Sequence, residues 1–397
     1  MEAKSKNKYD EELFRAMSEL PVLPFYGLVK QNKEDLEEKK QTFIKTGESP
    51  TFSYSRADAY NVSAYLDALT IFETKIPDLS DHQTLIELYQ RKCVELRKRA
   101  QLIEAIQHQN GQLVTSLSKE LFTTPKQNAD ELENEFKAML KDADTFFEHT
   151  KPIDSKKFLA YAKKLLSYYK LNNWRVELYK GSSVKINHGS TTLNPIIRIP
   201  KQLQISKSRA ARLLTHEIEI HALRTQNGIE SPLHLLRKGL DGYLLTEEGL
   251  ASYFQQQVSA KPRKYASGFW DAWTVALTQT GNFQQTFTTI FNAKLALAEK
   301  ANKDNALQIA QDAAWRLCLR VYRGIANTNQ TGVGFMRDHI YRSGYLEIKE
   351  AIETQGKQII PTLFAGNMGL HHIQKMQKLV ISTKKIPELV SKQIIAK

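Results

Sequence analysis

Leu213-Leu214-Thr215-His216-Glu217-Ile218-Glu219-Ile220-His221-Ala222 carries two histidines five residues apart, with a glutamate directly after the first. In the familiar H-E-x-x-H signature, histidines at i and i+4 share one helix face and bind Zn²⁺, while the glutamate acts as general base. Here one more residue separates the histidines, so a regular helix would turn them about 140° apart instead of about 40°. A single π-type turn would bring them together, and such turns are often found at functional sites. The stretch therefore predicts a metal-binding helix that is widened between Glu217 and Ala222.

A chance match has to be weighed against this prediction. The chain has 10 histidines in 397 residues, which gives an accidental H-E-x-x-x-H with a probability of roughly one in a hundred, and motif matches always include false positives. The rest of the sequence therefore has to supply the context that a metal site needs.

Composition excludes several classes of protein. The chain is 41% hydrophobic and 25% charged, which is typical of a globular protein with a sizeable core. No apolar run approaches the ~20 residues that span a bilayer, and the basic N-terminus leads into Asp10-Glu11-Glu12 instead of an apolar signal segment. Cys93 and Cys318 are the two cysteines of the chain, too few for a cysteine metal site or a disulfide framework. We therefore predict a protein of the reducing cytoplasm, without a membrane partner.

The charge balance indicates an acidic partner. The net charge of +13 attracts acidic peptides or polyanions. However, the sequence contains no zinc finger, no RNP-type aromatic motif and no compact basic helix, so a nucleic-acid partner is disfavoured. We expect an acidic protein tail as substrate or partner, and the oligomeric state stays open.

The order of patterns predicts an α+β, mainly α fold with a small antiparallel sheet before the active-site helix. Residues 1–50 form an N-terminal arm, either packed on the rest or mobile. Residues 51–370 form the main domain, made of a helical layer (51–171), the sheet (174–200), the active-site helices (206–260) and pocket-forming helices with a loop (262–370). Residues 371–397 form a basic C-terminal segment, in which His371 and His372 are structural or surface residues. The expected helices cover residues 10–20, 32–46, 58–74, 81–110, 112–121, 128–147, 155–171, 269–280, 283–300 and 305–321.

Three short runs predict the sheet. Trp174–Tyr179, Ser183–Asn187 and Pro195–Pro200 are strand-like, and His188–Ser190 is typical of a turn. Zinc peptidases commonly have such a sheet before the H-E helix. Its edge strand offers backbone groups to an extended substrate, which is recognition by strand addition.

Helix signals flank the metal motif. Ser206 is a suitable N-cap, and Asn227-Gly228 predicts the end of the active-site helix. Thr246 can cap a further helix with Glu247 and Glu248 in its first turn. Acidic residues there are favoured by the helix dipole in any protein. The alternative is that one of these glutamates is the third ligand of a His₂Glu zinc site.

Three ordered segments resemble the H-E-x-x-x-H tyrosine carboxypeptidases, whose bacterial members carry a Q/E-E-G-L-A motif and which include the animal microtubule-associated enzyme. The segments are the opening stretch, Glu247-Glu248-Gly249-Leu250-Ala251, and the pair Arg320-Val321-Tyr322-Arg323-Gly324 and Phe335-Met336-Arg337-Asp338. Leu121–Pro125 and the sheet are also similar, so the likeness runs from about Thr51 to about Ala365. The family usually has F-T-K-D where this chain has Phe335–Asp338, and Arg and Lys are not equivalent at a carboxylate site. The choice between C-terminal tyrosine and phenylalanine therefore stays open.

The resemblance implies a zinc metallocarboxypeptidase that removes a C-terminal tyrosine or phenylalanine. By this likeness His216, His221 and Glu248 hold Zn²⁺, and Glu217 is the general base that activates water.

Such an enzyme also needs a cation for the free carboxylate of its substrate, because guanidinium groups bind carboxylates bidentately. Our candidates for this cation are Arg323 and Arg337. Tyr341 or His339 is the candidate for stabilising the oxyanion. Singly, each arginine of this loop also fits a solvated surface charge.

Two other functions remain as alternatives. The H-E-x-x-x-H spacing also occurs in dipeptidyl peptidase III-like enzymes, so another zinc peptidase, an endopeptidase or a dipeptidyl peptidase, fits the motif. A catalytically silent module could use the basic surface to bind acidic tails or nucleic acid. Glu217 disfavours this last alternative, because a purely structural metal site does not need a general base.

Overall fold

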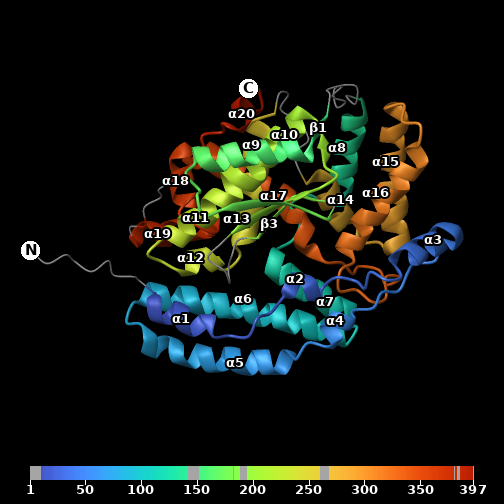
Figure 1. The fold of residues 1–397 in the computed structure, drawn as a ribbon. Helices are drawn as coiled ribbons and strands as arrows, with labels where there is room; N and C mark the ends of the chain where they lie inside the picture. The colour runs from blue at the N-terminus through green and yellow to red at the C-terminus, as the bar shows by residue number, and fades with distance from the viewer. Residues whose placement is uncertain are drawn as a thin grey trace, which may run out of the picture.

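Helices build most of this computed structural model (Figure 1). The structure describes residues 10–141, 152–181, 183–187, 195–259, 268–379, 381 and 385–396. It is 67% helix with small sheets, so the predicted α+β, mainly α class is confirmed. None of the helices within these ranges is long and apolar enough to cross a membrane.

The N-terminal helices form a layer below the rest of the molecule in Figure 1. Its members are α1 (Glu11–Ser18), α2 (Phe25–Leu28), α4 (Ser55–Asp58), α5 (Val62–Lys75), η1 (Ile76–Leu79), α6 (Gln83–Gln107) and α7 (Gly111–Phe122). The apolar stripe of α6 is buried, as its periodicity predicts, and includes Tyr89, Cys93 and Ile103. Asn61 and Asn110 cap the following helices by accepting backbone N–H groups.

From Asp10 on, the residues of the predicted N-terminal arm pack against the rest of the molecule. In α1, Leu13 and Met17 are buried. In α3 (Leu36–Thr46), Phe43 packs its ring 4.7 Å from Phe287 and 5.9 Å from Trp315. These aromatic contacts attach the arm to α15 (Phe283–Lys300) and α16 (Ala306–Val321).

The sheet differs from the expected antiparallel one. β4 (Ile196–Pro200) lies in the middle, with β2 (Arg175–Tyr179) parallel to it and β3 (Lys185–Asn187) antiparallel to it. The antiparallel prediction is therefore wrong for the β2–β4 pair. β2 and β3 lie on opposite edges of β4, and β2 runs in the same direction as β4. The predicted turn at residues 188–190 lies outside the described residues. A second, two-stranded pair joins β1 (Ile153–Asp154) to β5 (Gln204–Ile205), and β3 contacts the active-site helix.

The active-site helix is continuous and contains the predicted π segment. α10 (Lys207–Leu214) leads into η3, a π-helix over Thr215–Ala222, and then into α11 (Leu223–Glu230). Ser206 caps it by accepting the Arg209 N–H, as predicted. The predicted stop at Asn227-Gly228 is wrong, because Asn227 donates to the Phe364 carbonyl instead of ending the helix. Gly228 permits a close approach, since a Cβ there would lie 2.7 Å from the Leu236 carbonyl oxygen.

The second active-site helix, α13 (Tyr243–Gln257), begins one turn earlier than predicted, after Gly242. Thr246 is therefore not its cap, and its hydroxyl instead accepts the backbone N–H of Leu370. Left-handed Gly242, at φ 62°, starts the helix without a side-chain cap. Glu247 and Glu248 consequently lie inside the helix, where both are buried.

The remaining helices complete the described helical structure, and α17 among them packs against α13. They are α8 (Ala129–Lys141), α9 (Ser155–Tyr168), α12 (Leu235–Lys238), α14 (Phe269–Leu277), η4 (Met336–His339), α17 (Ile340–Gln355), η5 (Lys357–Ile359), α18 (Ile360–Leu363), η6 (Leu370–His372), α19 (Ile373–Lys378) and α20 (Ser391–Ala396). Residues 142–147 of the helix predicted at 128–147 lie outside the described ranges. α13 and α17 cross at two glycines: a Cβ on Gly249 would lie 2.4 Å from the Gly344 carbonyl oxygen.

Candidate active site

The π segment turns His216 and His221 toward each other. Their ring centres lie 4.6 Å apart at an interplanar angle of 84°. Glu248 of α13 faces both, with its Oε2 atom 3.5 Å from His216 Nε2 and 3.7 Å from His221 Nε2. The extra residue in the motif is thus accommodated by i→i+5 bonding, and it brings the three predicted ligands within 4.8 Å of one another.

The chemistry of these three residues fits a zinc ion. Glu248 Oε2 is buried without a hydrogen-bond partner among the described residues, which is costly unless something else satisfies it. Its distances to the two imidazole nitrogens are too long for hydrogen bonds. They are close to the roughly 3.4 Å that separates ligands placed about 2.1 Å from a tetrahedral Zn²⁺. Two nitrogens and one carboxylate oxygen are also the donors of His₂Glu catalytic zinc sites.

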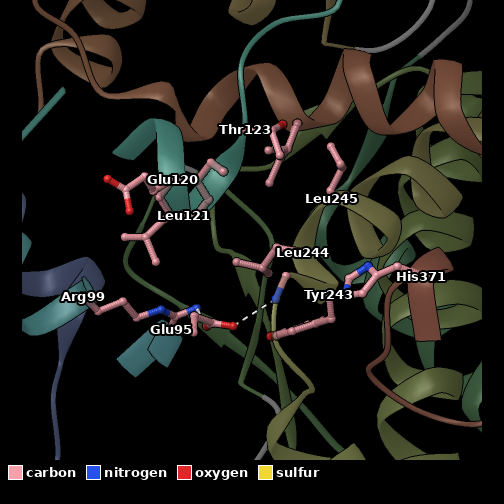
Figure 2. Close-up of a pocket in the computed structure, with 12 residues that line it drawn as sticks. Glu95, Arg99, Glu120, Leu121, Thr123, Tyr243, Leu244, Leu245 and His371 are labelled. Atoms are coloured by element: carbon pink, nitrogen blue, oxygen red, sulfur yellow. Dashed lines mark hydrogen bonds and ion pairs between the residues drawn. The ribbon is translucent and has the colours of Figure 1, made fainter. Parts of the chain in front are cut away.

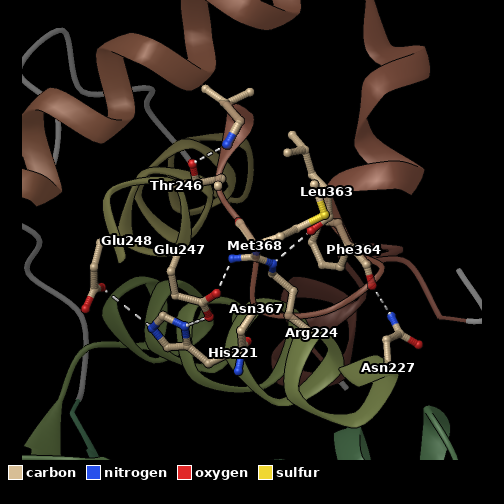
Figure 3. Close-up of polar contacts among 12 residues, drawn as sticks. His221, Arg224, Asn227, Thr246, Glu247, Glu248, Leu363, Phe364, Asn367 and Met368 are labelled. Carbon is tan, nitrogen blue, oxygen red and sulfur yellow. Dashed lines mark hydrogen bonds and ion pairs between the residues drawn. The ribbon is translucent and has the colours of Figure 1, made fainter. Parts of the chain in front are cut away.

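Behind His221 lies a buried chain of polar contacts, drawn in Figure 3. His221 Nδ1 donates to Glu247 Oε1 at 2.5 Å, and Arg224 pairs with the other oxygen of Glu247. Arg224 also donates to the backbone carbonyls of Leu363 (2.9 Å) and Met368 (2.7 Å). A carboxylate on Nδ1 fixes the tautomer of a metal-binding histidine and leaves Nε2 directed at the metal.

The electrostatics of the group favour a cation. Burial lowers the pKa of His221, but the hydrogen bond to Glu247 and the surrounding carboxylates raise it to about 9. Burial raises the pKa of Glu248, but the two histidines and Arg337 lower it to about 2. The negative charge around His221 therefore stabilises a positive charge at the centre of the site.

The far side of the π segment is held by Glu219 and the C-terminal residues. Glu219 is fully buried and accepts hydrogen bonds from Thr215 (2.8 Å), Tyr169 (2.8 Å) and the backbone N–H of Val390 (2.8 Å). Ser391, the first residue of α20, lies 2.6 Å from the Thr215 hydroxyl. In Figure 1, α20 accordingly lies beside α10 and α9. The last residues of the chain thus help to hold the helix that carries both histidines.

Glu217 lies between the two histidines in sequence and is half-buried. Burial raises its pKa, the charges of His216 and His221 oppose this shift, and the charge of Glu248 adds to it. A carboxylate with a raised pKa is a stronger base than one in water.

Four charged residues of the predicted binding loop form one cluster. Asp338 is fully buried and accepts from Arg320 (2.9 Å) and Arg337 (3.1 Å), with Arg323 at 3.5 Å. Burial raises the pKa of Asp338, but these three cations hold it far below its ordinary value. Arg337 also reaches the metal group, because its Nη2 lies 3.7 Å from Glu248 Oε1. Of the two predicted carboxylate-binding arginines, Arg337 is thus the one that contacts a predicted ligand.

The two oxyanion candidates have different surroundings. Burial and the charge of Glu248 raise the pKa of Tyr341, which keeps its phenol protonated and able to donate. His339 is fully buried, and its Nε2 donates to the Phe122 carbonyl at 2.9 Å while its Nδ1 lies 2.9 Å from the Ser343 hydroxyl. Both ring nitrogens of His339 are therefore in use: Nε2 joins η4 to the end of α7, and Nδ1 contacts Ser343 of α17.

A pocket of about 170 Å³ opens next to the start of α13 (Figure 2). Its apolar walls are formed by Leu121, Phe122, Leu244, Leu245 and Ile340. Glu95 and Arg99 of α6 and Tyr243 of α13 supply its polar wall. Leu244 and Leu245 lie on α13 four and three residues before Glu248, and none of the three candidate ligands lines the pocket itself.

His371 and His372 form a second group with Asp241. His372 Nδ1 accepts the backbone N–H of Gly369 (3.1 Å), so the neutral ring carries its proton on Nε2, which donates to Asp241 (2.9 Å). This Nε2 has no lone pair left for a metal. The group is therefore a hydrogen-bonded anchor of the loop before α13, in agreement with the structural role predicted for the histidine pair.

Sequence reasoning missed four contributors to this site. Glu247 occupies the Q/E position of the motif, next to a predicted ligand, and both residue types at this position can accept from a histidine Nδ1. Glu219 lies in the opening stretch, and Arg224 follows that stretch by two residues. A charged side chain that is buried in such a helix needs a partner of opposite charge or a hydrogen bond. Tyr26 belongs to the N-terminal arm, and its position near Arg337 has no local sequence signal.

Comparison with known proteins agrees with this geometry. A family model described as microtubule-associated tyrosine carboxypeptidase matches residues 40–384. The match contains the π segment, α13 and the loop with Arg337, and it extends beyond the predicted limits of Thr51 and Ala365. Residues 1–39 and 385–397 lie outside it. A search of curated proteins found no match.

Proposed function

Because this chain belongs to the microtubule-associated tyrosine carboxypeptidase family, we propose that it removes a C-terminal tyrosine or phenylalanine from protein or peptide tails. Membership makes it a metallocarboxypeptidase. The observation that carries the finer proposal is the group formed by His216, His221 and Glu248 next to Glu217, with the unpartnered carboxylate oxygen of Glu248 facing both histidines.

We assign the metal as zinc, held by His216, His221 and Glu248. Once bound, zinc polarises the scissile carbonyl and lowers the pKa of water to about 7. Glu247 keeps Nε2 of His221 free for the metal by accepting from Nδ1. Glu217 takes a proton from the attacking water and delivers it to the leaving amine, and burial raises its pKa in support of this role.

The loop residues supply the remaining roles. Arg337 binds the terminal carboxylate of the substrate, since its Nη2 lies next to Glu248 and the terminal carboxylate is only three bonds from the scissile carbonyl carbon. Tyr341 donates to the developing oxyanion, and its raised pKa keeps the proton in place. His339 is assigned a structural role, because its hydrogen bonds to Phe122 and Ser343 use both ring nitrogens.

The pocket beside α13 takes the aromatic side chain of the terminal residue. Leucines and Phe122 cover a ring on its apolar walls, and Glu95 and Arg99 offer partners to a phenol hydroxyl at the polar wall. This arrangement favours tyrosine over phenylalanine, since a site built to hydrogen-bond a hydroxyl rejects the analogue that lacks it.

The residues upstream of the cleaved one are proposed to be acidic. Burial lowers the pKa of Lys30, and the charges of Arg323 and Lys185 lower it further, so each of these two cations lies close enough to repel Lys30. An acidic tail relieves that repulsion. The family description suggests a microtubule protein as one such substrate.

The test is a peptide that ends in Glu-Glu-Tyr, incubated with the zinc-loaded protein and followed by mass spectrometry. The proposal predicts loss of the single terminal tyrosine, and slower loss from the matching peptide that ends in phenylalanine. Internal cleavage or release of a dipeptide would instead establish another class of zinc peptidase. No cleavage of either peptide, or of peptides with other terminal residues, would refute the enzymatic proposal.

A further inference from the structure

Tyr26 of α2 lies between two arginines. The guanidinium carbon of Arg337 lies 4.9 Å from the centre of the Tyr26 ring, and that of Arg99 lies 5.9 Å from it. Phe25 anchors the segment, with its ring 6.4 Å from Phe335 and the Arg99 guanidinium 5.5 Å away. Tyr26 therefore joins the active-site loop, through Arg337, to the pocket wall, through Arg99. It precedes residue 40 and so lies outside the family match.

Polar atoms on these side chains lack partners. Among the described residues, the hydroxyl of Tyr26, Nε of Arg337 and Nε of Arg99 are buried without a hydrogen-bond partner. The other nitrogens of Arg337 are directed at Asp338, at 3.1 Å, and at Glu248, at 3.7 Å. A buried donor without a partner is costly. The Tyr26 hydroxyl and Arg337 Nε are two such donors on stacked side chains, which indicates a ligand that accepts from both.

We propose that Tyr26 is a substrate-binding residue, and that its hydroxyl and Arg337 Nε together donate to the terminal carboxylate of the peptide. This inference rests on the proposed carboxypeptidase function. A carboxylate has two oxygens and about four acceptor sites, so it can accept from both donors at once. The stacked ring also limits the guanidinium to one plane, which lowers the entropy lost on binding.

The charge balance supports an anion at this place. Arg320, Arg323 and Arg337 converge on Asp338, and Asp271 pairs with Arg320 at 2.7 Å. Within this cluster three cations face two carboxylates, and the third carboxylate that Arg337 meets, Glu248, belongs to the candidate metal group. Arg323 is the less suitable partner for the substrate, because no contact joins it to Tyr26 or Glu248 among those described, whereas Arg337 contacts both.

Binding in the Glu217→Gln background tests the proposal without turnover. The probes are a peptide ending in Glu-Glu-Tyr and the same peptide with a C-terminal amide, titrated calorimetrically into the zinc-loaded variant. The free acid should bind more tightly than the amide. Adding Tyr26→Phe, which keeps the ring and removes the hydroxyl, should reduce this preference about tenfold, the effect of one hydrogen bond to a charged group. Arg337→Gln should also reduce it.

Tyr168→Phe is the matched control. Tyr168 is the exposed last residue of α9, and its hydroxyl donates to Glu388. Removing this hydroxyl should leave the preference for the free acid unchanged. If Tyr26→Phe also leaves the preference for the free acid unchanged while Tyr26→Leu lowers that preference, Tyr26 only positions Arg337 by stacking. This result overturns the proposal but leaves the carboxypeptidase function standing. If the Glu217→Gln protein does not distinguish acid from amide and the wild type cleaves neither peptide, the proposed function itself fails. Thermal melts of each variant verify that it is folded.

Discussion

Glu247 accepts a hydrogen bond from His221 on one carboxylate oxygen and pairs with the fully buried Arg224 on the other. It therefore acts on the metal site without being one of the three proposed ligands. Glu247 thus orients the metal ligand His221. Removing the Glu247 carboxylate would leave Arg224 as an uncompensated buried charge.

Glu247→Ala should therefore weaken zinc binding about 10- to 100-fold and destabilise the fold by about 3–5 kcal/mol. A competition titration with a zinc chelator and urea unfolding measure the two effects. Glu247→Gln is the control, because its amide oxygen still accepts from His221 Nδ1, and it should lose less zinc affinity. Equal zinc affinity in the alanine variant and the wild type would contradict the orienting role.

His339 makes stability depend on pH. Burial lowers its pKa from 6.5 to about 4, so the unfolded chain binds a proton more readily than the folded one between these values. The contribution of neutral His339 to the free energy of unfolding is complete above pH 6.5. It is lost as the pH falls toward 4, and the total loss is about 3 kcal/mol. Urea unfolding at pH 7 and pH 4 should show a smaller acid loss for His339→Gln than for the wild type. An equally steep loss in both proteins would contradict this assignment.

At the scale of the elements, the crossing of α13 and α17 places Glu248. Gly249 follows this residue directly, and a Cβ on it would lie 2.4 Å from the Gly344 carbonyl oxygen, a backbone atom that cannot move aside alone. The glycine of the E-G-L-A motif is therefore explained by helix packing.

Gly249→Ala should separate the two helices, lower the free energy of unfolding by about 1–3 kcal/mol and weaken zinc binding, because Glu248 moves with α13. Gly27→Ala is the matched control, since a Cβ there meets nothing within 4 Å. Chemical unfolding together with zinc titration provides the measurement. Retained stability in the Gly249 variant would show that the crossing is more tolerant than its geometry implies.

The elements also show how far the sequence predicts this fold. Helices with long apolar stripes, such as α6 and α15, are found within a few residues of their predicted limits, because their periodicity is local. The π segment is predictable for a different reason: two ligands five residues apart require it. The order of the strands is not local, so nothing in Arg175–Tyr179 indicates that it pairs with β4 in parallel. Asn227 and Thr246 have the composition of helix ends, but tertiary hydrogen bonds to Phe364 and Leu370 use their side chains instead.

At the scale of the whole molecule, the segments outside the family match converge on the site from two sides. Tyr26 stacks on Arg337 from the N-terminal side. Val390 and Ser391 bond to Glu219 and Thr215 on the π segment from the C-terminal side. The candidate ligands are predictable from their motifs, whereas these contacts join residues more than 170 positions apart and need the folded structure.

Removing residues 386–397 should therefore loosen the π segment. Buried Glu219 loses the Val390 N–H, a change of about 1–3 kcal/mol, and Tyr169 loses the N–H of Glu388. Hydrogen exchange should be faster at residues 215–222, and zinc affinity should fall. Lys392→Ala is the control, because this side chain is exposed. Unchanged exchange in the truncated protein would mean that the C-terminal residues do not support the site.

The most direct test of the central claim measures zinc content and turnover of the Glu-Glu-Tyr peptide in the same samples. Glu217→Gln should keep one zinc per chain and lose turnover by about 10²–10⁴-fold, whereas His216→Ala should lose the zinc. Glu230→Gln, at the end of the same continuous helix, should match the wild type in both. A Glu217→Gln protein that still cleaves the peptide, or a His216→Ala protein that keeps its zinc, would contradict the site built here on the π-helix.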